Sequence, residues 1–188
     1  MKKGLIAIIS VVAVLVIIVV AVIGGYNGLV TAEEDVNNKN SAISTQLQRR
    51  AELIPNFVNS VKGYTDYESK TYKDVTEARS AVAGANNAKE QSEANGELNR
   101  AISVWVNAVT ENYPNLKADA QFIALQDELA GSENRLATAR KDYNDAVTKF
   151  NSSIRRFPKS IIAGIFGFQK YDYFENDAGT DKVPEVKF

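Results

Sequence analysis

The most apolar stretch of the chain lies near its N-terminus, from Leu5 to Ile23. These nineteen consecutive residues contain no charged side chain and one hydroxyl group, that of Ser10. A helix of this length covers about 28 Å, close to the hydrocarbon thickness of a bilayer. A chain of this size would have difficulty burying a helix that is apolar on every side. The pattern therefore predicts one membrane-spanning helix within an anchor domain of residues 1–25.

A cleaved secretory signal is the alternative explanation, because small residues such as Ala21 and Gly25 would suit a cleavage site. The apolar region of a secretory signal is shorter, however, at about 7 to 15 residues. The chain also has no cysteine to be lipidated. We therefore expect a retained anchor and a location in the bacterial cytoplasmic membrane, crossed once.

Charged residues on the two sides of the span predict its orientation. Lys2 and Lys3 precede the apolar run, whereas Glu33, Glu34 and Asp35 follow it. Lys and Arg residues near a span favour the cytoplasmic side. The N-terminus is expected inside and the rest of the chain outside.

The pattern after the span predicts a helical domain over residues 26–158, with helices at about 26–50, 52–83, 88–112 and 115–157. Apolar residues recur at steps of three, four and seven, which is typical of amphipathic helices that pack as in coiled coils. The fold class expected is all-α: one N-terminal transmembrane helix, then an elongated up-and-down four-helix bundle with a short C-terminal extension. The clearest series are Leu29, Val36, Ile43 and Leu47; Leu98, Ile102, Trp105 and Val109; and Phe122, Leu129, Leu136, Tyr143, Phe150 and Phe157.

Pro55 leaves two interpretations of the first helices. If Glu52 lies near an N-cap, Pro55 falls in a first turn, where its missing N–H costs nothing, and the chain reverses at residues 49–51. Four alternating helices then bring the segment after Pro158 back to the membrane. If Pro55 is only a kink in one long helix, three long helices place that segment at the far tip. We expect the turn.

The last part of the chain, residues 159–188, comprises an apolar segment and an acidic, irregular tail. The apolar segment is too short to span a membrane and too apolar for a free loop. It is predicted to form a membrane-proximal or assembly contact, with folding back onto its own bundle as the alternative. The residues of this contact are Ile161, Ile162, Ile165, Phe166 and Phe168.

Composition excludes several functional classes. Two of the 22 basic residues precede the span, which leaves 20 against 23 acidic residues, and this balance argues against nucleic-acid binding. The absence of Cys and His removes the usual zinc ligands, thiol nucleophiles and imidazole bases. No Gly-rich phosphate loop or serine elbow is evident. We expect no enzyme activity, no cofactor, no metal and no small-molecule substrate.

Charged residues within the apolar stripes form the other candidate site: Glu68, Arg79, Glu133 and Arg140. Paired acid and base groups of a catalytic site are one interpretation. The interpretation we favour is a structural ion-pair network that fixes the register of the helices. Asn144 and Asn151, seven residues apart, are interpreted in the same way, with a substrate-binding amide pair as the alternative.

Short motifs follow one another along the chain: Tyr26-Asn27-Gly28-Leu29-Val30, Arg49-Arg50-Ala51-Glu52-Leu53-Ile54-Pro55, Tyr113-Pro114-Asn115-Leu116, Ala139-Arg140-Lys141-Asp142-Tyr143-Asn144, and Pro184-Glu185-Val186-Lys187-Phe188. In this order they resemble LemA family proteins over essentially the whole chain. The resemblance implies a bacterial single-pass membrane protein with an elongated four-helix domain and no assigned activity. It also implies a link to membrane remodelling, which is associated with some LemA-like members. The usual Asp before Leu-Ile-Pro is Glu52 here.

Two functions remain as expectations. The first is a membrane-anchored structural protein that forms homo-oligomers and organises or remodels the bilayer. The second is an accessory or sensor module that docks onto another envelope protein, such as a transporter or a protease. The expected partners are thus the lipid bilayer, further copies of the chain and, under the second reading, another envelope protein.

Overall fold

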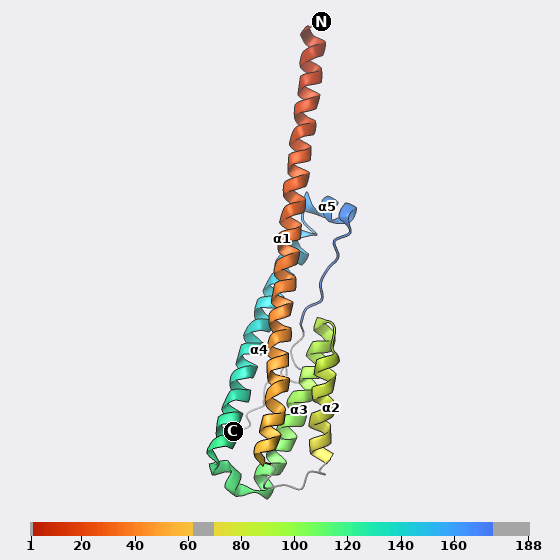
Figure 1. The fold of residues 1–188 in the computed structure, drawn as a ribbon. Coiled ribbons are helices and arrows are strands. Elements are labelled where there is room, and N and C mark those ends of the chain that lie inside the picture. Colours follow the sequence, from red (N-terminus) through yellow and green to blue (C-terminus); the bar gives the residue numbers. More distant parts are fainter. Residues whose placement is uncertain (1, 62–69, 175–188) are drawn as a thin grey trace, which may run out of the picture. The chain divides into compact units, whose positions relative to one another are not determined.

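The computed structural model describes residues 2–61 and 70–174 (Figure 1). Within these residues every regular element is a helix, so the all-α class with a long apolar N-terminal helix is confirmed. Glu68 and the tail beyond Phe174 lie outside the described residues. The elements are α1 (Lys2–Val61), α2 (Lys70–Gly84), α3 (Ala88–Asn112), the 3-10 helix η1 (Pro114–Ala118), α4 (Ala120–Ser153) and α5 (Lys159–Phe166).

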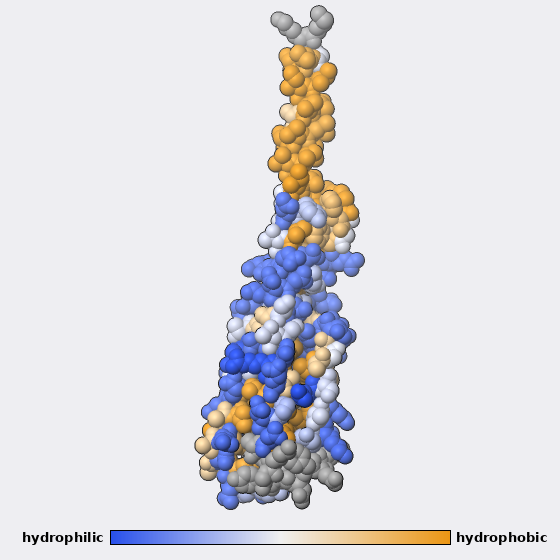
Figure 2. Space-filling model, in the orientation of Figure 1, coloured by the Kyte–Doolittle hydropathy of each residue, from blue (hydrophilic) through white to orange (hydrophobic). Residues whose placement is uncertain are grey.

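The N-terminal part of α1 is apolar on its whole circumference. Its large side chains between Leu5 and Ile23 are between 37% and 67% exposed, and Figure 2 shows them as an uninterrupted hydrophobic column. By length and composition this part of the helix is able to cross a membrane. Lipid would cover the apolar surface that the protein itself leaves exposed.

Helix α1 does not end before Pro55 but continues to Val61, so the turn expected at residues 49–51 is wrong. A proline inside a helix has no N–H for the carbonyl four residues earlier, here that of Ala51. In this structure that carbonyl accepts a hydrogen bond from Arg79 Nε at 2.8 Å. The side chain of Arg79 thus satisfies the backbone acceptor that Pro55 leaves without its helical partner.

The seven-residue spacing of buried positions also runs across Pro55 without a shift. Leu29, Val36 and Ile43 are fully buried, and the next two positions of the series, Arg50 and Phe57, are buried as well. One face of α1 therefore stays against its neighbours on both sides of the proline. This packing favours a continuous helix over a chain reversal.

The structure divides into two compact units, which are described separately. The first combines residues 2–38 with 145–171, and the second combines 39–61 and 70–144 with 172–174. Helix α1 and helix α4 each contribute to both units.

The second unit contains four helical segments that alternate in direction (Figure 1). Along α1, Ser44 bonds Gln91 and Arg50 bonds Asn95, so α1 and α3 run parallel. Lys39 pairs with Asp142, whereas Arg49 pairs with Glu128, so α1 and α4 run antiparallel. Helix α2 reverses into α3 through residues 85–87 and packs along it.

Aromatic rings fill the core of the second unit. Phe57 stacks on Phe122 with ring centroids 5.0 Å apart and meets the edge of Trp105 at 5.3 Å. Offset and edge-to-face pairs of this kind are the favoured geometries of aromatic side chains. The predicted series of α3 is buried throughout, comprising Leu98, Ile102, Trp105 and Val109.

Helix α4 is shorter than the expected range of 115–157. Residues 114–118 form η1, and Asp119 caps α4 by accepting hydrogen bonds from the N–H groups of Gln121 and Phe122, both at 2.9 Å. The helix ends at Ser153, and Phe157, the last member of the predicted apolar row, is 82% exposed. The side chain of Asp119 thus caps the start of the helix, five residues after the expected start at residue 115.

Candidate functional site

Helix α5 presents one apolar surface inward and another outward. It begins after Pro158 and ends at Gly167, whose φ of 79° is a left-handed conformation suited to glycine. The N–H groups of Gly167 and Phe168 both bond the carbonyl of Ala163, at 2.9 and 3.0 Å. Ile162 and Ala163 are buried, whereas Ile161, Ile165 and Phe166 are 55%, 72% and 53% exposed.

The inward surface of α5 packs on α1 just after the apolar run. A Cβ atom on Gly25 would collide with Ile162 Cδ1, so glycine permits this close approach, whereas the neighbouring Gly24 faces open space. The ring of Tyr26 lies 4.7 Å from that of Phe166 and 5.8 Å from that of Phe168. The five residues of the predicted contact are therefore gathered on or beside a short helix at the end of the apolar run.

Most of the outward surface of α5 is hydrophobic. Figure 2 shows a second apolar patch where Figure 1 places α5, next to the apolar part of α1. The alternative of folding back onto the chain accounts for Ile162 and Ala163 but leaves Ile161, Ile165 and Phe166 uncovered. That this surface meets a membrane or another copy of the chain remains a prediction.

An amide clamp fixes the chain after α5 within the first unit. Asn151 donates from Nδ2 to the carbonyl of Tyr171 at 2.9 Å and accepts from the N–H of Tyr171 at 3.0 Å. The Tyr171 hydroxyl donates to Asn37 Oδ1 at 3.2 Å. Burial and the neighbouring charge of Glu33 raise the pKa of Tyr171 above its ordinary value.

The second unit repeats the same amide arrangement. Asn144 donates to the carbonyl of Phe174 at 2.9 Å and accepts from its N–H at 2.8 Å, and the Tyr143 hydroxyl donates to the carbonyl of Asp172. The guanidinium of Arg140 lies over the ring of Phe174, 4.8 Å from its centroid. Asn144 and Asn151 therefore bind the backbone of the segment after α5, a role that their spacing alone did not reveal.

Glu133 is the centre of the charged cluster in the second unit. Its Oε2 pairs with Arg50, and its Oε1 lies 3.8 Å from Arg140 Nη1. Arg50 also donates to Asn95 Oδ1 at 3.2 Å. The side chains of Arg50 and Arg140 are only 7% and 11% exposed. Because both carboxylate oxygens face guanidinium groups, the geometry favours a structural ion pair, and that role remains a prediction.

The structure thus brings together Glu133 and Arg140 but assigns Arg79 to the Ala51 carbonyl. Glu68 cannot be placed, because it lies outside the described residues. Sequence reasoning missed Arg50, although it follows Ile43 by seven residues and so occupies the next position of the buried series. It also missed Gly25, because the sequence alone does not show which glycine another helix will approach.

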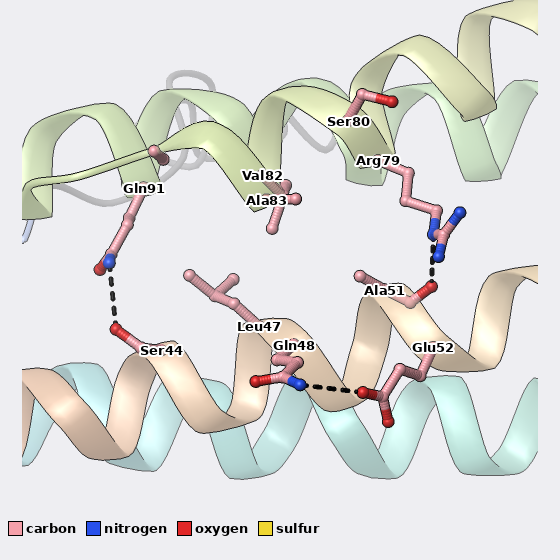
Figure 3. Close-up of a pocket in the computed structure, with 11 residues that line it drawn as sticks. Ser44, Leu47, Gln48, Ala51, Glu52, Arg79, Ser80, Val82, Ala83 and Gln91 are labelled. Carbon is pink, nitrogen blue, oxygen red and sulfur yellow. Dashed lines mark hydrogen bonds between the residues drawn. The ribbon is translucent and has the colours of Figure 1, made fainter.

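A cavity of about 530 Å³ lies among α1, α2 and α3 of the second unit (Figure 3). The polar groups that line it bond largely to one another. Gln91 donates to Ser44 at 3.1 Å, and Gln48 donates to Glu52 at 3.0 Å. Among the described residues there is no group of three or more acidic side chains arranged to hold a metal ion. The cavity therefore offers no constellation that points to a particular reaction.

Comparison with known proteins gives a consistent result. The model of the LemA family matches residues 39–188. Magnetosome protein MamQ 2 of Paramagnetospirillum magneticum is 25% identical over 181 residues, covering 83% of this chain and 66% of that protein. Protein LemA of Metamycoplasma hominis is 26% identical over 153 residues, covering 81% of this chain and 67% of that protein. The chain therefore spans about two thirds of the length of the curated relatives it matches.

Proposed function

Because the chain belongs to the LemA family, we propose that it is a non-catalytic, membrane-anchored structural protein that associates with copies of itself and organises or remodels the bilayer. The similarity to MamQ supports the link to membranes, because MamQ is named as a protein of the magnetosome. The proposal places the chain in the bacterial cytoplasmic membrane as a single-pass envelope protein.

The observation on which this proposal chiefly depends is the surface of α5. A contiguous exposed apolar patch on a protein surface often marks a contact with a membrane or another protein. Those of α5 lie beside Tyr26, in the first turn after the apolar run. Tyrosine at such a position is typical of the membrane interface. The protein would then touch the bilayer at two places, through its span and through α5.

The proposed orientation has the N-terminus inside and the helical units outside, as Lys2, Lys3 and the acidic residues after the span suggest. Protease added to intact spheroplasts should digest the chain after residue 26 while a cytoplasmic marker protein stays intact. Full protection of the chain would contradict this orientation.

Self-association is best tested on the full chain in lipid nanodiscs or native membranes, by cross-linking followed by native mass measurement. We expect homo-oligomers whose population rises with the protein-to-lipid ratio. A foreign envelope protein recovered in fixed stoichiometry with single copies of the chain would favour the accessory-module alternative and contradict the proposal.

A further inference from the structure

We propose that α5 and the basic residues around it form a binding surface for anionic phospholipid headgroups. This inference rests on the proposed membrane anchoring, and it adds the chemical class of the lipid. The surface consists of Ile161, Ile165 and Phe166 on α5 together with the flanking cations Arg155, Arg156, Lys159 and Lys170. It is continuous with the span, because α5 packs on α1 at Gly25 and Tyr26.

The contacts between α5 and α1 indicate how far this surface lies from the hydrocarbon core of the bilayer. Tyr26 lies three residues beyond Ile23, and Gly28 lies five residues beyond it, so a helix along the bilayer normal places them about 4.5 and 7.5 Å above the apolar run. The polar layer of each leaflet is about 5 to 8 Å thick. Phe166, against Tyr26, therefore falls near the base of this layer. Lys159 Nζ, 3.4 Å from the position of a Cβ on Gly28, falls at the level of the phosphates.

Positive charges predominate at this level. Residues 146–171 contain five basic residues and no acidic one, and residues 24–32 of α1 are uncharged. Arg155, Arg156 and Lys170 are exposed, and Lys159 is half-buried. The nearest carboxylate along α1 is Glu33, ten residues and about 15 Å beyond Ile23. Glu33 is only about 7.5 Å beyond Gly28 on α1, and Glu33 and Glu34 act on Tyr171, the neighbour of Lys170, so these carboxylates offset part of the charge of Lys159 and Lys170. The five basic residues of 146–171 still outnumber the three acidic residues of 33–35.

The apolar and basic residues together indicate which ligand this surface binds. A short helix with an exposed Ile and Phe surface and cations beside it is typical of elements that lie in the membrane interface. Each Lys or Arg at an anionic surface strengthens attraction about fivefold, whereas a surface without net charge supplies no such gain. The apolar side chains alone would suit any lipid or a second copy of the chain. The excess of cations favours anionic headgroups.

The chain has no cysteine, so a single Ile165→Cys substitution provides a unique site for a fluorophore on the exposed side of α5. The full chain is reconstituted in vesicles of phosphatidylcholine with about 30% phosphatidylglycerol. Quenching is then compared for phosphatidylglycerol and phosphatidylcholine that bear the same spin label on the headgroup. We expect the anionic lipid to quench at least about threefold more per molecule, and added salt to reduce this preference.

The variant Arg155→Gln/Arg156→Gln/Lys159→Gln should bring the ratio of the two quenching efficiencies close to one. The matched control Lys73→Gln/Lys89→Gln/Lys117→Gln removes three exposed cations of the second unit and should leave the ratio unchanged. Circular dichroism verifies that both variants fold.

Three results would overturn the inference. Equal quenching by both lipids in the unmodified sequence would show a bilayer contact without recognition of charge, and would leave the proposed function intact. Quenching absent at residue 165 but strong at a label on Asn27 would remove the bilayer contact itself. Energy transfer between labels on different copies, with no lipid quenching, would assign the surface to a second copy of the chain. Self-association is measured separately, so failure of the inference and failure of the proposed function are distinguishable.

Discussion

Arg79 compensates for the proline inside α1 by bonding a backbone carbonyl that Pro55 cannot serve. The carbonyl of Ala51, a buried residue, has no helical donor because Pro55 lacks an N–H, and Arg79 supplies the donor instead. A buried carbonyl without a partner costs about 1 to 3 kcal/mol. The two residues are therefore expected to be coupled energetically.

A double-mutant cycle tests this coupling. Arg79→Ala should lower the free energy of unfolding of the second unit by about 1 to 3 kcal/mol when Pro55 is present. In the Pro55→Ala background the restored N–H can bond Ala51, so the same substitution should cost less than about half as much. The fluorescence of Trp105, the single buried tryptophan, reports unfolding of this unit during denaturation of the full chain in detergent. An equal cost in both backgrounds would refute the pairing.

Two glutamates of α4 provide a matched comparison for the buried ion pairs. Glu133 pairs with Arg50 and Arg140, which are nearly buried, whereas Glu128 pairs with the exposed Arg49 and Arg135. Glu133→Ala should cost about 3 to 5 kcal/mol, because it leaves two guanidinium groups without their carboxylate. Glu128→Ala should cost no more than about 1 kcal/mol.

Denaturation followed through Trp105 gives both values, and Arg140→Ala should also lower the melting temperature by several degrees. If Glu133→Ala and Glu128→Ala were equally mild, the cluster around Glu133 would not be structural. The catalytic or binding interpretation of these residues would then regain weight.

At the scale of elements, Gly25 lies where α5 packs on α1. Gly25 allows Ile162 to approach α1, whereas Gly24 has nothing within 4 Å of the position of a Cβ. Gly25→Val should displace α5 and speed hydrogen exchange of the α5 amides about tenfold or more, and Gly24→Val should not. Exchange of the Gly167 and Phe168 amides, measured by mass spectrometry on the full chain, distinguishes the two. Equal protection in both variants would contradict the packing.

Seven-residue spacing predicted most of the helices, because burial of one helix face is a property of local sequence. The same spacing also indicated that the helix continues through Pro55. Arg50 and Phe57 continue the series of Ile43, which requires one unbroken helix. Pro55 and an expected N-cap near Glu52 predicted a turn instead. The donor that bonds the Ala51 carbonyl in place of the missing N–H of Pro55 is Arg79, 28 residues further along the chain. Long-range pairs of this kind are not visible in a local pattern.

The same reason limits prediction of the candidate site. The apolar segment around Ile165 was identifiable from composition. Its packing against Tyr26 could not be predicted, because it depends on how many times the preceding helices reverse direction. Of the two alternatives, reversal at Pro55 is wrong, and the structure shows the other, one long helix through Pro55. The far-tip position that this alternative implied for the segment after Pro158 is wrong, because Phe166 lies against Tyr26. In the second unit α2 runs opposite to the end of α1, although the reversal expected at residues 49–51 is absent. The roles of Asn144 and Asn151 depended on a distant backbone segment and were equally hidden.

For the whole molecule, a single helix connects the apolar run to the helical units. Helix α1 has no break between Lys2 and Val61, so the tether is helical and not an unstructured linker. The apolar run and the exposed apolar side chains of α5 lie next to each other in the first unit.

The central claim is that the chain meets the bilayer both through its span and through α5. The most direct measurement places a fluorophore at Phe166→Cys in the full chain, reconstituted in vesicles that contain headgroup quenchers. A control label at Tyr26→Cys reports the end of the span. The account predicts strong quenching at both positions. Strong quenching at residue 26 with none at residue 166 would contradict it.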